Sequence, residues 1–271
     1  MPDSESDEEP QTADSLFQTA VVVEAGLGLL AVVLGYLFGP DPRQWIPVLD
    51  EVPSLAGGLG LGILATFPLL LLMAVIRRIN HPAVQELDQL AEHPMMSVML
   101  KMGPLELLAI SLCAGVGEEL LFRGWLMPAI AGLLHGDAVS LLPSNTESVR
   151  PWWAFGGYAA EVFATLPANA NSIRESAALT WSGFSAWWSN SIGWELTMGW
   201  IASSIAFGFV HPISKLYVVV TGIMGLYFGA LLILTGNLLI PIVAHALYDA
   251  IQLWAASAEA QSEQRSIKQT A

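Results

Sequence analysis

Residues 104–134 read PLELLAISLCAGVGEELLFRGWLMPAIAGLL, an apolar run long enough to cross a lipid bilayer as a helix. The run nevertheless contains Glu106, Glu118, Glu119 and Arg123. A charged residue at the centre of a membrane helix costs about 2.5–3.5 kcal/mol on insertion scales, and such residues almost always face the interior of a helical bundle. We therefore expect this stretch to be a central helix of a multi-spanning membrane protein.

The composition of the whole chain agrees with a membrane protein. Hydrophobic residues make up 54% of the 271 residues and charged residues only 13%, with a mean hydropathy of +0.56, whereas soluble domains carry about 25% charged residues. The apolar residues fall into blocks of membrane-spanning length, which predicts an all-α fold, a polytopic transmembrane bundle of about six spans with an extramembrane Trp-rich insertion. The expected spans are 16–38, 55–76, 104–134, 196–210, 216–234 and 238–256.

The chain divides by composition into consecutive regions. Residues 1–16 are acidic and lack Lys and Arg, which is typical of a disordered tail. Residues 17–103 contain two transmembrane helices and an amphipathic connector. Residues 104–256 form the membrane domain with the buried charges, interrupted by the polar insertion 136–195, and residues 257–271 are a C-terminal tail. The net charge of −14 gives no indication of nucleic-acid binding. Lys and Arg are more frequent in the segments on the side of the termini, which predicts that both ends are cytoplasmic.

Glu118 and Glu119 differ in their expected surroundings. Glu119 and Arg123 are four residues apart and share a helix face, in the favourable order for an ion pair. Glu118 points about 100° away from that face and lacks this partner. A carboxylate placed in such a site can act as a general base. The alternative is a purely structural ion-pair cluster.

Two later spans carry histidines. His211 follows Phe207 by four residues near the end of a span, and His245 precedes Asp249 by four residues in the last span. Each could simply cap or stabilise its helix, but an Asp beside a His also fixes the orientation of the imidazole. Together with Glu118, these residues predict a hydrated polar cavity inside the membrane, where Glu and His can activate water for hydrolysis.

The expected span boundaries create a conflict in depth. Glu118 lies about 21 Å along its helix from the cytoplasmic end, whereas His211 lies near the cytoplasmic end of its own span. For the two side chains to meet, a helix must tilt, kink or begin elsewhere.

The three motifs together resemble the CPBP family of intramembrane glutamic endopeptidases, which includes CAAX prenyl proteases and bacteriocin-processing proteins of the Abi family. The matching positions, in the order EExxxR, FxxxH and Hxxx(N/D), are Glu118, Glu119, Arg123, Phe207, His211, His245 and Asp249. The resemblance covers residues 104–135 and 197–256. Asp249 stands where the prenyl-protease branch has Asn, and the insertion makes the first two motifs more widely separated than is usual in the family.

The resemblance implies an enzyme that hydrolyses peptide bonds of membrane-associated substrates, with prenylated proteins as one option. Glu118 and His211 would activate water, and His245 and Asp249 would bind the oxyanion or orient the site. Glu119 would share the site, and Arg123 and Phe207 would support it. The implied partners are the lipid bilayer and a membrane-associated peptide or protein, and the implied location is the cell (plasma) membrane.

Other functions fit the same residues. Glu118, His211 and His245 are ligand types for a catalytic zinc ion, although the chain lacks HExxH, so no cofactor is expected and zinc is the alternative. A non-enzymatic scaffold, immunity or partner-binding protein could use the same polar cluster. A transporter has little support because inverted repeats are not detectable in the sequence.

Overall fold

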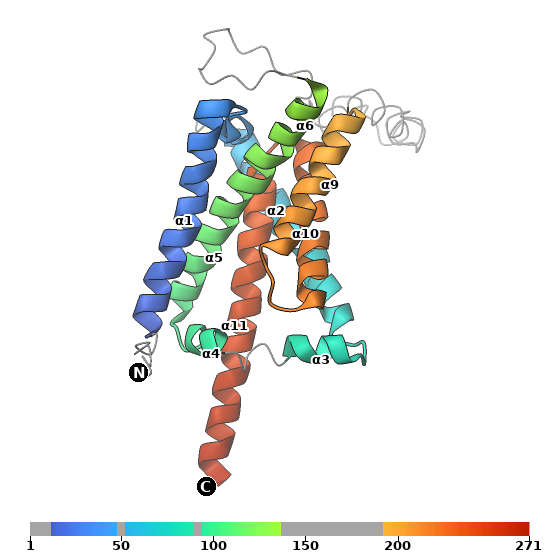
Figure 1. Cartoon of the computed structure of the whole chain (residues 1–271). Coiled ribbons are helices and arrows are strands. Elements are labelled where there is room, and N and C mark those ends of the chain that lie inside the picture. The colour runs from blue at the N-terminus through green and yellow to red at the C-terminus, as the bar shows by residue number, and fades with distance from the viewer. Residues whose placement is uncertain (1–11, 48–51, 89–93, 137–191, 271) are drawn as a thin grey trace, which may run out of the picture.

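The computed structural model describes residues 12–47, 52–88, 94–136 and 192–270, and these residues contain helices and no strands (Figure 1). Most of the acidic tail and of the Trp-rich insertion lies outside the described residues. The all-α prediction is confirmed. The elements are α1 (Ala13–Phe38), η1 (Pro42–Trp45), α2 (Val52–Ile76), α3 (Pro82–Asp88), α4 (Pro94–Met99), α5 (Pro104–Glu119), η3 (Leu120–Leu126), α6 (Met127–His135), α9 (Trp194–Phe209), α10 (Lys215–Thr235) and α11 (Leu239–Thr270).

Four helices are long and apolar enough to cross a membrane. They are α1, α2 from Ser54, α10, and α11 up to Ser262. Their outward faces expose large apolar side chains such as Val22, Leu64 and Leu71, as expected for surfaces that contact lipid. About six spans remain compatible with this arrangement when α9 and the α5–α6 segment are added to the four.

The segment that carries the buried charges is helical from Pro104 to His135 but changes its winding in the middle. The regular α5 ends at Glu119, seven residues of π-helix form η3, and α6 continues from Met127. The wider turn places Arg123 within η3. Segments of π-helix are often found at functional sites.

The conflict in depth is removed by the shortness of α9. This helix has 16 residues, so it is about 24 Å long, less than the roughly 30 Å thickness of the hydrocarbon core. In Figure 1 it descends beside α6 and ends inside the bundle, and a short loop leads on to α10. His211 therefore lies at the depth of Glu118 rather than at the membrane surface.

A tight turn between α10 and α11 sets the position of the last motif. Gly236 adopts a left-handed conformation, with φ of 64°, which a residue without a Cβ tolerates best. The side-chain Oδ1 of Asn237 accepts a hydrogen bond from the backbone N–H of Leu239 at 3.0 Å, which satisfies a free donor at the start of α11. The turn folds α11 back along α10 and brings His245 into the bundle.

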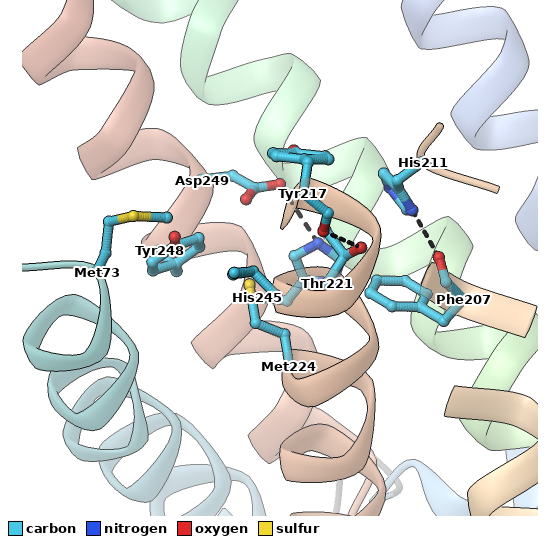
Figure 2. A pocket seen from close by; sticks show the side chains of 10 residues that line it. Met73, Phe207, His211, Tyr217, Thr221, Met224, His245, Tyr248 and Asp249 are labelled. Carbon is cyan, nitrogen blue, oxygen red and sulfur yellow. Dashed lines mark hydrogen bonds and ion pairs between the residues drawn. The ribbon is translucent and has the colours of Figure 1, made fainter. Parts of the chain in front are cut away.

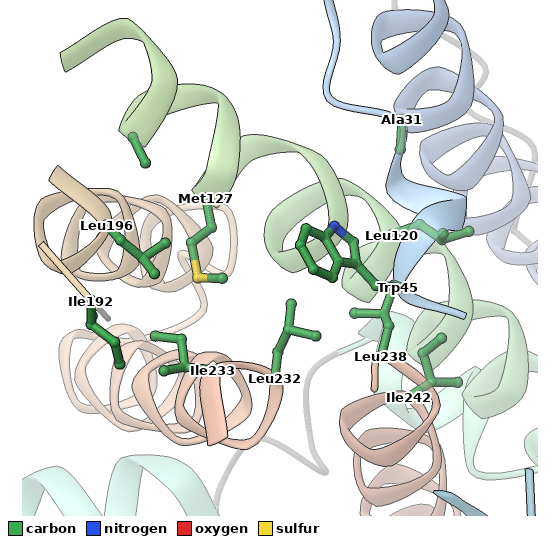
Figure 3. Packing of buried hydrophobic residues seen from close by; sticks show 11 residues of the cluster. Ala31, Trp45, Leu120, Met127, Ile192, Leu196, Leu232, Ile233, Leu238 and Ile242 are labelled. Carbon is green, nitrogen blue, oxygen red and sulfur yellow. The ribbon is translucent and has the colours of Figure 1, made fainter. Parts of the chain in front are cut away.

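The core of the bundle lies between the elements that carry the site (Figure 3). Met127 and Leu196 pack against Leu232 and Leu238, and Ala31 and Trp45 close the side near α1. These contacts hold α6, α9, α10 and α11 together above the polar site.

The structure adds helices to the predicted connector and to the predicted C-terminal tail. The amphipathic connector contains two short helices, α3 and α4, on either side of residues 89–93, which lie outside the described residues. The tail at 257–271 continues α11 to Thr270, and this extension projects away from the bundle (Figure 1). Its first residues are held by the Ser257 hydroxyl, which donates to the carbonyl of Leu100 at 2.8 Å.

Close packing of α2 on α11 depends on glycines at two successive turns of α2, Gly58 and Gly62. A Cβ on Gly62 would lie 2.6 Å from the Cβ of Val243, whereas a Cβ on Gly60 would meet nothing within 4 Å. Only the face with Gly58 and Gly62 therefore serves the helix contact that small residues allow in membranes.

We predict that alanine at Gly62 and alanine at Gly60 affect stability differently. Gly62→Ala should lower the free energy of unfolding by about 1–3 kcal/mol, because the added methyl group overpacks the contact with α11. Gly60→Ala should be neutral or slightly stabilising, because alanine favours the helix. Denaturant unfolding of the purified protein in detergent measures both, and equal stabilities of the two variants would contradict the packing described.

Candidate active site

Helices far apart in sequence bring the predicted site residues into one cluster. Glu118 Oε1 lies 3.5 Å from His211 Nε2, and Glu118 Oε2 lies 3.9 Å from His245 Nε2. Asp249 Oδ2 lies 3.3 Å from the same His245 nitrogen. The structure thus places the two histidines and Glu118 within reach of a single water molecule.

His211 is oriented by a contact with α9, the helix that it follows. Its Nδ1 lies 2.8 Å from the backbone carbonyl oxygen of Phe207, and a carbonyl can only accept, so Nδ1 carries the hydrogen. In the neutral ring Nε2 is then a proton acceptor, and it faces Glu118. The pair therefore offers two acceptors to one water molecule.

His245 is held on both ring nitrogens. Its Nδ1 contacts Glu119 Oε1 at 2.9 Å, while its Nε2 faces Asp249. Because ionised carboxylates only accept hydrogen bonds, the doubly protonated imidazolium satisfies both contacts. The ring also stacks on Phe228, with centroids 4.9 Å apart and an interplanar angle of 16°. His245 is thus a fixed, nearly fully buried donor rather than a mobile base.

Glu119 contacts a second partner besides Arg123. The predicted pair forms, with Arg123 Nη1 2.9 Å from Glu119 Oε1, and both side chains are completely buried. The same Oε1 atom contacts His245, so one carboxylate oxygen links α5, η3 and α11. Glu119 therefore connects the charge-balancing arginine to the imidazole of the site.

Arg123 is accommodated by aromatic rings. Its guanidinium lies over Phe207, 4.0 Å from the ring centroid, a geometry in which the ring face attracts the cation. A Cβ on Gly225 would lie 3.1 Å from Arg123 Nη2, so glycine at this position of α10 leaves room for the guanidinium. Phe207 also packs edge-on against His245, so its ring contacts both the guanidinium and the imidazole.

A cavity of about 50 Å³ adjoins the cluster (Figure 2). This is ample for water, which needs about 10–15 Å³ by the same measure. The cavity combines the polar His211, His245 and Asp249 with apolar side chains. The other lining residues are Met73, Phe207, Tyr217, Val220, Thr221, Met224 and Tyr248.

Several residues near the site were not identified from the sequence. Tyr217 and Tyr248 sit on apolar helices where tyrosine is unremarkable, and only the fold shows that they face the cavity. Glu24 is different, because it is the one charged residue between Leu16 and Phe38. A carboxylate within a membrane helix is energetically costly, and this argument applies to Glu24 as it does to Glu118.

The expected alternative of a zinc site depends on ligand geometry. Among the residues that the structure describes, no three His, Cys, Asp or Glu side chains are grouped so as to hold a metal ion. The carboxylates and imidazoles instead contact one another.

Comparison with known protein families agrees with this geometry. The profile of the type II CAAX prenyl endopeptidase Rce1-like family matches residues 101–251, more than half of the 271 residues. The chain belongs to this family. Searches among curated proteins and among solved structures gave no match.

The match confirms the resemblance drawn from the three motifs. All seven motif residues lie within the matched region, whereas α1 and α2 precede it. Membership in the Rce1-like family, together with the apolar helices, establishes an integral membrane protein of a protease family.

We predict that the buried pair is critical for stability. Arg123→Met should lower the free energy of unfolding by about 3–5 kcal/mol, because it leaves the Glu119 carboxylate buried without its counterion. Adding Glu119→Gln should restore part of this loss. Denaturant unfolding in detergent measures the free energy of unfolding of each variant, and thermal unfolding ranks their stabilities.

The matched control is Arg43→Met, which removes an exposed ion pair with Asp41 and should change stability by less than about 1 kcal/mol. An Arg123→Met variant as stable as the Arg43→Met variant would contradict the role given to the pair.

Proposed function

We propose that the chain is an intramembrane glutamic endopeptidase in which Glu118 activates water to hydrolyse a peptide bond of a membrane-associated substrate. The observation that carries the proposal is the position of Glu118, between two imidazoles, beside a cavity large enough for water. Membership in a family of endopeptidases supplies the reaction class. The assignment of roles to single residues is ours.

In the proposed reaction, a water molecule binds between Glu118 and His211. Glu118 takes one proton as the water oxygen attacks the carbonyl carbon, which forms the tetrahedral intermediate. When the carbon–nitrogen bond breaks, the same proton passes from Glu118 to the leaving amine. One water is consumed for each bond cleaved, and Glu118 returns to its starting state.

The imidazolium of His245 supplies positive charge to this site. Its charge opposes the negative charge that develops on the carbonyl oxygen, and fixed charges of this kind are most effective where water is excluded. Asp249 accepts rather than donates hydrogen bonds when ionised, so we assign it to holding His245. This role explains how an aspartate can occupy a position where the prenyl-protease branch has asparagine.

The substrate class follows from the surroundings of the cluster. The cavity combines water-binding groups with Met73, Val220 and Met224, so it suits an apolar side chain next to the scissile bond. A peptide tethered to the bilayer is the substrate type to test first, with and without a prenyl group. We also propose the plasma membrane as the location.

The proposal predicts that Glu118→Gln abolishes cleavage. The amide keeps the size of the carboxylate but cannot take a proton from water, and loss of a general base typically costs 10²–10⁴-fold in rate. The assay is cleavage of a bilayer-tethered peptide by purified protein in liposomes. Glu106→Gln is the control, because Glu106 is a half-buried carboxylate on the same helix that accepts from the Gly103 N–H, away from the site.

Full activity of Glu118→Gln would overturn the proposed mechanism. Metal analysis of the active protein distinguishes a zinc-dependent mechanism from the metal-independent one proposed here. Stoichiometric zinc that is required for activity would mean that zinc, and not Glu118, activates the water. Retained cellular function of a Glu118→Gln, His211→Ala double variant would indicate the non-enzymatic alternative.

A further inference from the structure

Glu24 of α1 is a carboxylate at the depth of the proposed site. It lies eleven residues after Ala13, so about 17 Å along α1, and Glu118 lies about 21 Å along α5. The two helices run side by side in the same direction (Figure 1). Both carboxylates are therefore near the middle of the membrane, where each is costly.

The backbones of α1 and α5 touch beside Glu118. A Cβ on Gly117 would collide with the carbonyl oxygen of Glu24, and a Cβ on Gly28 would lie 3.4 Å from the Cα of Gly117. Glu24 and Gly28 are four residues apart and share the face of α1 that meets α5. The backbone of α1 therefore contacts α5 at Gly117, the residue before Glu118.

The side chain of Glu24 is half-buried. Its Oε2 atom is fully buried and has no hydrogen-bond partner within the described parts of the chain. The carboxylate lies within electrostatic range of Glu118, His211, His245 and Asp249, which belong to α5, α11 and the residues just after α9. A buried carboxylate oxygen without a protein partner is a natural binding point for water.

Hydrolysis inside a membrane needs a supply of water that the substrate does not block. The cavity in Figure 2 is lined by side chains from α2, α10, α11 and the end of α9, with none from α1 among them, and in the proposed reaction a bound peptide would occupy it. Glu24 lies on the α1 side of Glu118, outside the region that the family profile matches.

We propose that Glu24 is a positioning residue that conducts water to Glu118 from the α1 side. The inference rests on the proposed function and adds a helix outside the matched region to the working site. Glu24 acts through the water that Glu118 activates, and it does not itself touch the substrate.

The kinetic test compares Glu24→Leu with Glu24→Gln on the bilayer-tethered peptide. Leucine removes the polar group, so kcat should fall at least tenfold while KM stays within twofold, because the substrate would occupy the cavity, which α1 does not line. The amide still binds water, so glutamine should keep kcat within threefold of the wild type. Thr19→Leu, an exposed polar residue of α1, should leave both constants unchanged.

A wild-type kcat for Glu24→Leu would overturn the inference. So would a Glu24→Gln variant as slow as Glu24→Leu, because that result would require an ionisable group rather than a polar one. In either case, peptide cleavage by the wild type would still support the proposed function, because that function does not depend on Glu24.

A second measurement does not depend on peptidase activity. In a Cys113→Ser background, Glu24→Cys is treated with the water-soluble reagent methanethiosulfonate ethyltrimethylammonium, which reacts with the thiolate that forms in contact with water. It should react at least tenfold faster than Val23→Cys, whose position is 53% exposed on the lipid-facing side of α1. Equal rates for the two cysteines would show that no water reaches Glu24, whatever the enzymatic activity.

Discussion

The buried contact of Glu119 with Arg123 and His245 is the interaction on which the rest of the site depends. A single carboxylate oxygen contacts the guanidinium and the imidazole, each at 2.9 Å. Without the arginine, the acidic cluster would hold unbalanced negative charge in a setting where charge is expensive. Without Glu119, α5 and α11 would lose the polar link that fixes the ring of His245. The pair therefore allows Glu118 to remain available as a base.

The geometry around this contact comes from helices that depart from regular membrane spans. Arg123 lies in the π-helical turn η3 and contacts Glu119, and the aromatic ring of Phe207 covers the guanidinium. The short helix α9 delivers His211 to the middle of the bundle instead of to its surface. Glycines at 62, 117 and 225 remove side chains where helices or the guanidinium come close. The π-helical turn and the short α9 thus bring polar groups to the site, and the glycines allow the close packing around it.

Much of this arrangement could be predicted from the chain because buried charge is rare in apolar helices. The spacing of Glu119 and Arg123 predicted their pair, and the three motifs predicted the family. The depth of His211 could not be predicted, since it depends on where α9 ends against its neighbours. The contact of Glu119 with His245 was also missed, because the spacing of residues in the sequence predicts contacts within one helix but not contacts between two helices. Glu24 was overlooked although its sequence signal was as clear as that of Glu118.

The central claim is that Glu118 acts as a base on water and does not attack the substrate itself. Single-turnover cleavage of a bilayer-tethered peptide in water labelled with ¹⁸O tests this directly by mass spectrometry of the product and of the Glu118 peptide. Attack by water predicts one ¹⁸O atom in the new carboxyl terminus and none in Glu118. An unlabelled product together with ¹⁸O in the Glu118 side chain would contradict the account and indicate a covalent intermediate.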